Sequence, residues 1–221
     1  MAYRTGMRGH SLPRTAFASA VVCLLAAACA FFQAHGTSPA IVAAATDTVP
    51  AYAPNGEMLP PTNYREWIYL SSGLGMSYTP EPAGMSSFDN VFVNPAAYRS
   101  FVATGTWPDK TVMVLESRGA ESKGSINQSG HYQGTDLMGV EVHVKDVARF
   151  PGGWAFFHFD SPAENGKVFA PTAGCYSCHQ QHGAVDTTFV QFYPTLLPIA
   201  RDKKTLSNAY LKEEATRPAT K

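Results

Sequence analysis

The chain has 221 residues, and its 17 lysines and arginines are balanced by 17 aspartates and glutamates, so its formal net charge is zero. A balanced charge provides no basic field for a polyanion, and we therefore expect no nucleic-acid partner. Hydrophobic residues make up 45% of the chain, which at this length favours one domain with a substantial core.

The first 36 residues have the order of a secretory signal peptide. Arg4, Arg8 and Arg14 form a positive region, and an apolar run from Ala16 to Phe32 follows it. Small residues behind this run offer a cleavage site near residue 36. We therefore predict export to the periplasm with residues 1–36 as a signal peptide. The alternative is a retained membrane anchor, because the apolar run approaches the lower limit for crossing a bilayer.

Cleavage of this signal peptide would leave two of the four cysteines in the mature protein. Cys23 and Cys29 lie within the predicted signal peptide, whereas Cys175 and Cys178 lie far behind it. Exported proteins normally use their cysteines as disulfides. A bridge between residues only three positions apart would constrain very little of the chain, so this pair indicates another use.

The segment that follows the signal peptide is rich in Pro, Ala and Thr, and we predict residues 37–60 to be a linker. The folded domain is predicted over residues 61–200, and a charged tail covers residues 201–221. A short helix from Asn63 to Leu70 should open the domain. Residues 71–87 are expected to form a loop.

Strands and helices alternate irregularly through the rest of the domain. Asn94 and Pro95 open a predicted helix that Gly105 ends. Further helical segments are expected at Ala173–Gly183 and Asp186–Ala200. Strands are predicted at Phe88–Val93, Thr111–Ser117, Leu137–Val144 and Trp154–Phe159. The sequence thus predicts an α+β fold, with an antiparallel sheet of four to five strands and flanking helices.

Cys175, Cys178 and His179 form the CxxCH pattern of covalent haem attachment. Two thiols at this spacing can add to the vinyl groups of one porphyrin, and the adjacent histidine then faces the iron. We therefore predict one covalent haem c on a C-terminal helix, with His179 as the metal ligand. A zinc site with His182 would need ligand pairs a dozen or more residues apart, and a redox-active pair would need a βαβ context.

Three segments in this order resemble the cytochrome P-460 family. They read FVNPAAYRSFVATGTWPDKTVMVLES, then MGVEVHVKDVARFPGGWAFFHF, then GCYSCHQQHGAVDTTFVQFYP, with a late CxxCH before an FYP element. The resemblance spans nearly all of residues 60–196 and implies a β-rich homodimer with one haem c per subunit. It allows two classes: enzymes that oxidise hydroxylamine through a lysine-cross-linked haem, and c′-beta cytochromes without the cross-link that bind nitric oxide or carbon monoxide.

Leu115 stands, by this resemblance, at the position of the cross-linking lysine. Leucine has no nucleophilic atom, so the bond to the porphyrin cannot form there, and the class without the cross-link is favoured. Lys110 and Lys123 flank the strand, but either would need a shift of several residues. A shift of even one residue turns every side chain to the opposite face of the sheet.

Other positions of the haem pocket are assigned by the same resemblance. Glu141 matches a carboxylate that is thought to move protons in the enzymes, and Met85 falls where relatives place a distal phenylalanine. Asp89 and Gln191 each stand where some relatives carry arginine, on the distal and the proximal side respectively. The alternatives are that Glu141 faces solvent on its strand and that Met85 fills the core.

We expect a c-type cytochrome whose five-coordinate haem binds nitric oxide or a similar small ligand, with Leu115 giving the pocket an apolar surface. A first alternative is an enzyme that oxidises hydroxylamine or nitric oxide, with Glu141 as the proton-transfer group. A second alternative is a periplasmic electron carrier in which Met85 or another methionine closes the sixth coordination position. The expected partners are the small ligand, a periplasmic redox protein and a second copy of the chain.

Overall fold

The computed structural model describes residues 50–78 and 86–217. The chain divides into two units, Met1–Ala44 and Ala45–Lys221, and the first lies outside the described residues. The predicted signal peptide and Met85 also lie outside them. Within the described ranges, no helix combines the length and the apolar character needed to cross a membrane.

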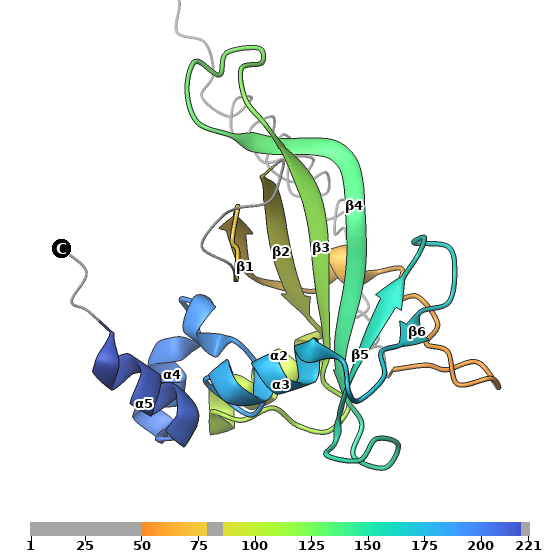
Figure 1. Ribbon diagram of the computed structural model, residues 1–221, viewed down its shortest axis with the longest axis vertical. Coiled ribbons are helices and arrows are strands. Elements are labelled where there is room, and N and C mark those ends of the chain that lie inside the picture. The colour runs from red at the N-terminus through yellow and green to blue at the C-terminus, as the bar shows by residue number, and fades with distance from the viewer. Residues whose placement is uncertain (1–49, 79–85, 218–221) are drawn as a thin grey trace, which may run out of the picture. The chain divides into compact units, whose positions relative to one another are not determined.

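Six strands form one antiparallel sheet in the order β1-β2-β3-β4-β5-β6. Each strand pairs with its neighbours in the sequence, so the sheet is a meander. Beyond the rest of the sheet, β3 and β4 continue as a long hairpin (Figure 1). The strands are β1 (Ile68–Leu74), β2 (Ser87–Val93), β3 (Val112–Glu121), β4 (Tyr132–Lys145), β5 (Trp154–Phe159) and β6 (Lys167–Val168).

Four helices lie together near one end of the strands (Figure 1). In the first of them, Asn94 precedes the helix, Pro95 occupies the first turn, and Gly105 ends it in a left-handed conformation with φ of 77°. The helices are α2 (Pro95–Thr104), α3 (Gly174–His182), α4 (Leu197–Lys203) and α5 (Asn208–Thr216), with single 3₁₀ turns η1 (Tyr64–Glu66) and η2 (Val190–Phe192).

The predicted α+β class with an antiparallel sheet is confirmed, and all four predicted strands are present. The sheet has six strands rather than four to five, because β1 and β6 were not predicted. β1 takes up residues 71–74 of the predicted loop 71–87, and β6 has only two residues and carries no readable pattern. The predicted helix Asn63–Leu70 is wrong beyond the 3₁₀ turn η1, since Ile68 and Tyr69 pair with β2. Pairing with β2, a contact between segments distant in the sequence that no local pattern records, decides the conformation of this segment.

The two faces of the sheet carry different sets of side chains. We call the face that bears the alternate residues Val112, Val114, Val142 and Phe157 the core face. The segment before β1 covers it, and Met58 is only 1% exposed there. The cluster on this face consists of Met58, Tyr64, Trp67, Val112, Val114, Val140, Val142, Val144, Ala155, Phe157 and Phe159.

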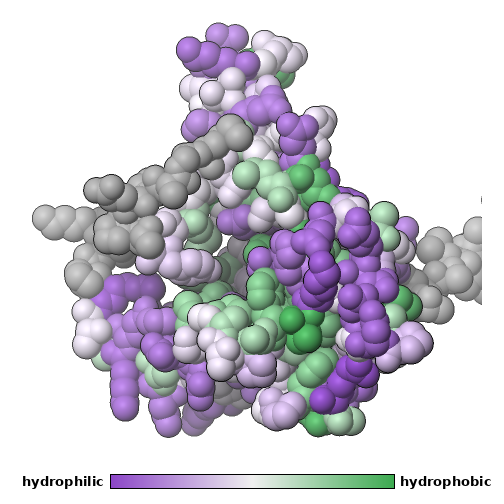
Figure 2. Space-filling view, turned by 45° about the vertical axis from the view of Figure 1, so that its right-hand side comes forward, coloured by the Kyte–Doolittle hydropathy of each residue, from purple (hydrophilic) through white to green (hydrophobic). Residues whose placement is uncertain are grey.

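We call the opposite face of the sheet, which bears Met113, Leu115 and His143, the pocket face. Near the helices it packs into a second cluster that includes Phe101 of α2, Leu196 before α4 and Tyr210 of α5. Towards the hairpin none of the residues in this second cluster covers the pocket face, and the hairpin tip is mostly hydrophilic (Figure 2). Within the described residues, this part of the pocket face is the region where a ligand can reach the sheet.

Candidate functional site

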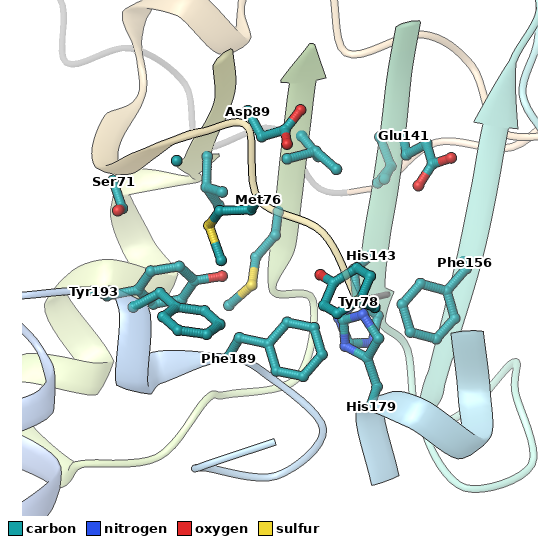
Figure 3. A pocket seen from close by; sticks show the side chains of 16 residues that line it. Ser71, Met76, Tyr78, Asp89, Glu141, His143, Phe156, His179, Phe189 and Tyr193 are labelled. Atoms are coloured by element: carbon teal, nitrogen blue, oxygen red, sulfur yellow. The ribbon is translucent and has the colours of Figure 1, made fainter. Parts of the chain in front are cut away.

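A pocket of about 210 Å³ lies against the pocket face of the sheet (Figure 3). Strands β1 to β5 form one wall, and α3 with the segment behind it forms the other. Most of the lining is apolar or aromatic, which is usual for cofactor sites. The lining residues are Ser71, Gly73, Met76, Tyr78, Asp89, Val91, Met113, Leu115, Glu141, Val142, His143, Phe156, His179, Phe189, Phe192 and Tyr193.

His179 enters this pocket from α3, as the sequence pattern requires of an iron ligand (Figure 3). Its Nδ1 lies 2.7 Å from the backbone carbonyl oxygen of Thr187. A carbonyl oxygen can only accept a hydrogen bond, so Nδ1 carries the proton and donates it. The proton-free Nε2 is then available for a metal, which is the usual arrangement around a ligating histidine.

Aromatic rings hold the His179 imidazole on several sides. The ring centroids of Phe189, Phe156 and His143 lie 4.1, 4.6 and 5.0 Å from that of His179. Burial lowers the pKa of His179, although the bond to the Thr187 carbonyl acts in the opposite direction. The imidazole is therefore neutral at physiological pH, as a metal ligand must be.

Cys175 and Cys178 lie on α3 with His179 and are free thiols, both partly exposed. Residues four apart share one helix face, so Cys175 and His179 point to the same side of α3. Tyr176 fixes the helix to the sheet: its hydroxyl donates to the Phe169 carbonyl oxygen at 3.2 Å and accepts from the Phe156 amide at 3.4 Å. The two thiols and the histidine are thus carried by one anchored helix.

Leu115 and Glu141 lie side by side on the pocket face. Leu115 of β3 pairs with Glu141 of β4 on one side and with Val91 of β2 on the other. Glu141 in turn pairs with His158 of β5. Because directly paired residues point to the same face of a sheet, this register forms one row of side chains across the pocket. The predicted distal positions Leu115 and Glu141 are therefore brought into the same cavity as His179.

Two carboxylates, Glu141 and Asp89, give the pocket a negative character. Both lie on the sheet, above His179 in the view shown (Figure 3). Asp89 accepts a hydrogen bond from the Ser117 hydroxyl at 2.7 Å. Burial raises the pKa of Glu141, the Asp89 carboxylate raises it further, and His158 opposes the shift. Among the described lining residues there is no lysine or arginine to neutralise either group.

Neither flanking lysine of β3 lines the pocket. Lys110 precedes the strand and forms an ion pair of 2.5 Å with Asp146. Lys123 lies in the β3–β4 hairpin, beyond the end of β3. Leu115 itself is half-buried at the pocket wall, where its side chain offers only apolar surface.

Two other residues singled out in the sequence stabilise the chain behind α3. Gln191 accepts a hydrogen bond from the Ala184 amide at 3.1 Å and donates one to the His182 carbonyl oxygen at 2.7 Å, so it holds the end of the helix. The His182 ring faces Glu213 of α5 at 3.0 Å. In the described part of the chain no three His, Cys, Asp or Glu side chains gather as a metal site, and the zinc alternative gains no support.

Several residues that line the pocket were not predicted from the sequence. His143 is buried against Phe156, with ring centroids 4.0 Å apart and planes 10° from parallel. A signal for it existed, because His143 follows Glu141 by two positions and so shares its face of the strand. Phe189 and Tyr193 lie in the helix predicted over Asp186–Ala200. That prediction is wrong before α4, because the segment contains only the 3₁₀ turn η2 and its course depends on tertiary packing.

A family model described as Cytochrome P460 matches residues 61–190, which is more than half of the chain. The fold and the site thus define a haem protein of the cytochrome P460 or c′ type. The chain belongs to the cytochrome P460 family, as the resemblance had indicated. No curated protein matches the chain.

Membership of this family implies a haem cofactor, and the residues of the site fit one. His179 presents a neutral imidazole with a free Nε2 to a largely apolar cavity, and two free thiols lie on the same helix. These are the groups that hold a haem in c-type cytochromes. The aromatic rings around His179 supply the apolar surroundings that a porphyrin requires.

Proposed function

We propose that this protein is an exported mono-haem c-type cytochrome that binds nitric oxide or a similar small neutral ligand. The observation that carries the proposal is the hydrogen bond from His179 Nδ1 to the Thr187 carbonyl oxygen. It leaves Nε2 free for a metal in a largely apolar pocket, and α3 also carries the thiols of Cys175 and Cys178. Haem, when bound, supplies an iron that coordinates a diatomic ligand.

The residues of the site have different roles in this proposal. Cys175 and Cys178 hold the cofactor covalently, and His179 is the axial ligand. Leu115 presents a half-buried apolar surface that excludes water and disfavours charged ligands. The carboxylates of Glu141 and Asp89 disfavour anions further, because no described cation of the lining balances them. Neither the apolar surface nor the carboxylates disfavour a neutral diatomic molecule.

The cellular setting belongs to the same proposal. The positive N-terminal region and the apolar run support export to the periplasm. Family membership supports a homodimer, and a haem protein that changes oxidation state needs a redox partner in the same compartment.

The ferrous absorption spectrum, recorded with and without nitric oxide, tests the proposal. A pigment that survives acidified solvent, with a high-spin ferrous spectrum that changes on addition of nitric oxide, is the expected result. A pigment that acidified solvent extracts would disprove covalent attachment. A low-spin ferrous spectrum without response to nitric oxide would disprove the open site and indicate an electron carrier, for which Met76 and Met113 of the pocket lining are candidate ligands.

Oxidation of hydroxylamine is the second candidate function, and Glu141 is the observation that favours it. A carboxyl whose pKa is raised in a cofactor pocket is suited to proton transfer. Leu115 speaks against this candidate, because it cannot form the family's lysine cross-link. We expect a protein mass equal to polypeptide plus ordinary haem c, and negligible turnover of hydroxylamine. Steady turnover, or a peptide in which Lys110 or Lys123 is joined to the haem, would decide for the enzyme.

A further inference from the structure

Thr187 contacts two histidines at the same time. Its backbone carbonyl oxygen accepts the hydrogen bond from His179 Nδ1 at 2.7 Å, and its side-chain hydroxyl lies 3.3 Å from His143 Nε2. One residue therefore joins the predicted iron ligand of α3 to a buried histidine of β4. Outer partners of this kind set the orientation and the basicity of a ligating imidazole.

Burial and ring packing fix the orientation of the His143 side chain. It is only 8% exposed, and its ring stacks on Phe156 with centroids 4.0 Å apart. Trp154 packs on it as well, with centroids 4.3 Å apart. The His143 ring has no freedom to turn away without breaking this stack, so its bond to the Thr187 hydroxyl restrains Thr187.

The loop that carries Thr187 is held close to α3 on its other side. Thr188 is 1% exposed, and its hydroxyl accepts a hydrogen bond from Trp107 Nε1 at 2.8 Å. Gly183 permits the close approach: a Cβ there would lie 2.6 Å from the His179 carbonyl oxygen and 2.9 Å from the Thr187 carbonyl carbon. The loop is thus held in place by its neighbours, and the hydroxyl of Thr187 links it to His143.

We propose that His143 is a positioning residue for His179, which acts through the hydroxyl of Thr187 and sets the hydrogen bond that the Thr187 carbonyl accepts. The inference rests on the proposed function, because His179 has to be the axial ligand. A well-aligned bond makes the imidazole a stronger electron donor, which stabilises ferric over ferrous iron. Loss of the alignment should therefore raise the reduction potential.

The reduction potential of the purified haem protein, measured by redox titration, tests this role. Thr187→Val removes the hydroxyl but keeps the carbonyl, and His143→Phe keeps the stacked ring but removes Nε2. Each variant should change the ferric-to-ferrous ratio at a given potential about tenfold. This is the lower end of the range of effects, about tenfold to a hundredfold, that follow loss of an outer partner of a metal ligand. For one electron a tenfold change corresponds to about 59 mV upwards. The double variant should shift no further than either single one.

Matched controls separate this role from a general loss of structure. Thr187→Ser restores the hydroxyl and should keep the potential of the unaltered protein. Thr135→Val, on an exposed stretch of β4, and His131→Phe, at an exposed position of the β3–β4 hairpin, repeat the chemical changes away from His179 and should leave the potential unchanged. If His143→Phe does not accumulate, the pair Thr187→Val and Thr187→Ser decides alone.

Unchanged potentials in Thr187→Val and His143→Phe would overturn the inference while leaving the proposed function intact. A shift in Thr187→Ser as large as that in Thr187→Val would overturn it too, since the hydroxyl would then be irrelevant. A protein that carries no haem at all would overturn both the proposed function and the positioning role.

Discussion

Each face of the sheet carries a glutamate, and the two glutamates differ in their hydrogen-bond partners. Glu116 points to the core face, is 3% exposed, and receives hydrogen bonds from Tyr64, Arg65 and Arg118. Glu141 points to the pocket face from the neighbouring strand, and among the described residues no hydrogen bond to its carboxylate is formed. The core face therefore provides its buried carboxylate with hydrogen-bond donors, whereas the described residues of the pocket face provide none for Glu141.

The pKa values of the two glutamates follow from this difference. Burial alone would raise the pKa of Glu116, but the hydrogen bonds and charges of Arg118, Tyr64 and Arg65 outweigh burial and lower it. The pKa of Glu141 is raised by burial and by Asp89, and only His158 opposes the shift. The core face thus gains stability from its polar groups, whereas ionised Glu141 on the pocket face weakens the fold.

Replacing both thiols of α3 should have the largest effect, and it should be confined to the pocket side. In the variant with Cys175→Ala and Cys178→Ala, acidified solvent should extract all of the haem, because no thioether bond remains. Each single variant should keep one bond. Pigment that stayed attached in the double variant would contradict the assignment of the motif.

A matched pair of phenylalanine substitutions sharpens the comparison of the faces. Phe157 on the core face is 0% exposed, so Phe157→Ala should cost about 4 kcal/mol of unfolding free energy through the cavity it leaves. Phe189 is half-buried in the pocket, so Phe189→Ala should cost about 1.5 kcal/mol. Urea unfolding measures both values. Equal costs would mean that the pocket wall is as closed as the core.

Glu116→Gln should destabilise the protein by about 2 kcal/mol at neutral pH, because bonds to a buried charge are lost. The folded-state pKa of Glu116 is lowered from its ordinary value of 4.5, so its stabilising effect is complete above pH 4.5. As the pH falls below 4.5 towards the lowered folded-state pKa, the effect disappears. Urea unfolding at pH 7 and pH 3 should therefore show a difference that shrinks in acid, and a constant difference would contradict the role of the charge.

Local patterns predicted the parts of the fold that local residues determine. The four predicted strands and the helix from Pro95 have strong periodicity or capping residues, and the structure contains them. The prediction for the segment from Ile68 was wrong because pairing with β2, a segment distant in the sequence, decides its conformation. The two-residue strand β6 exists only through its contact with β5.

A similar distinction applies to the site. Cys175, Cys178 and His179 form one sequence motif, whereas Leu115 and Glu141 were assigned to the pocket by the resemblance to the cytochrome P-460 family. Thr187 and Phe189 lie in an irregular segment whose contacts arise only when it folds back on α3 and β4. The apolar residues of this segment predicted a helix that does not form there, and residue type alone does not distinguish a ligand's partner from an ordinary loop residue.

The smallest predicted effect, that of Glu141→Gln, has the opposite sign to that of Glu116→Gln. The pKa of Glu141 is raised above its ordinary 4.5 in the folded state, so ionisation weakens the fold once the pH exceeds 4.5. Glutamine carries no charge, and the variant should be more stable than the unaltered protein at pH 7. Because Glu141 is exposed to the open pocket, solvent screening limits the gain to about 0.5 kcal/mol.

Urea unfolding of both proteins at pH 7 and at pH 4 measures this gain. At pH 4 the carboxyl is protonated in both the folded and the unfolded state for most molecules, so the two proteins should unfold at the same urea concentration. Glu116→Gln, measured in parallel, controls for the change from carboxylate to amide on an adjacent strand. A loss of stability at pH 7 in Glu141→Gln would show that Glu141 has a structural partner. The pocket face would then satisfy its charge as the core face does, and the contrast between the faces would not hold.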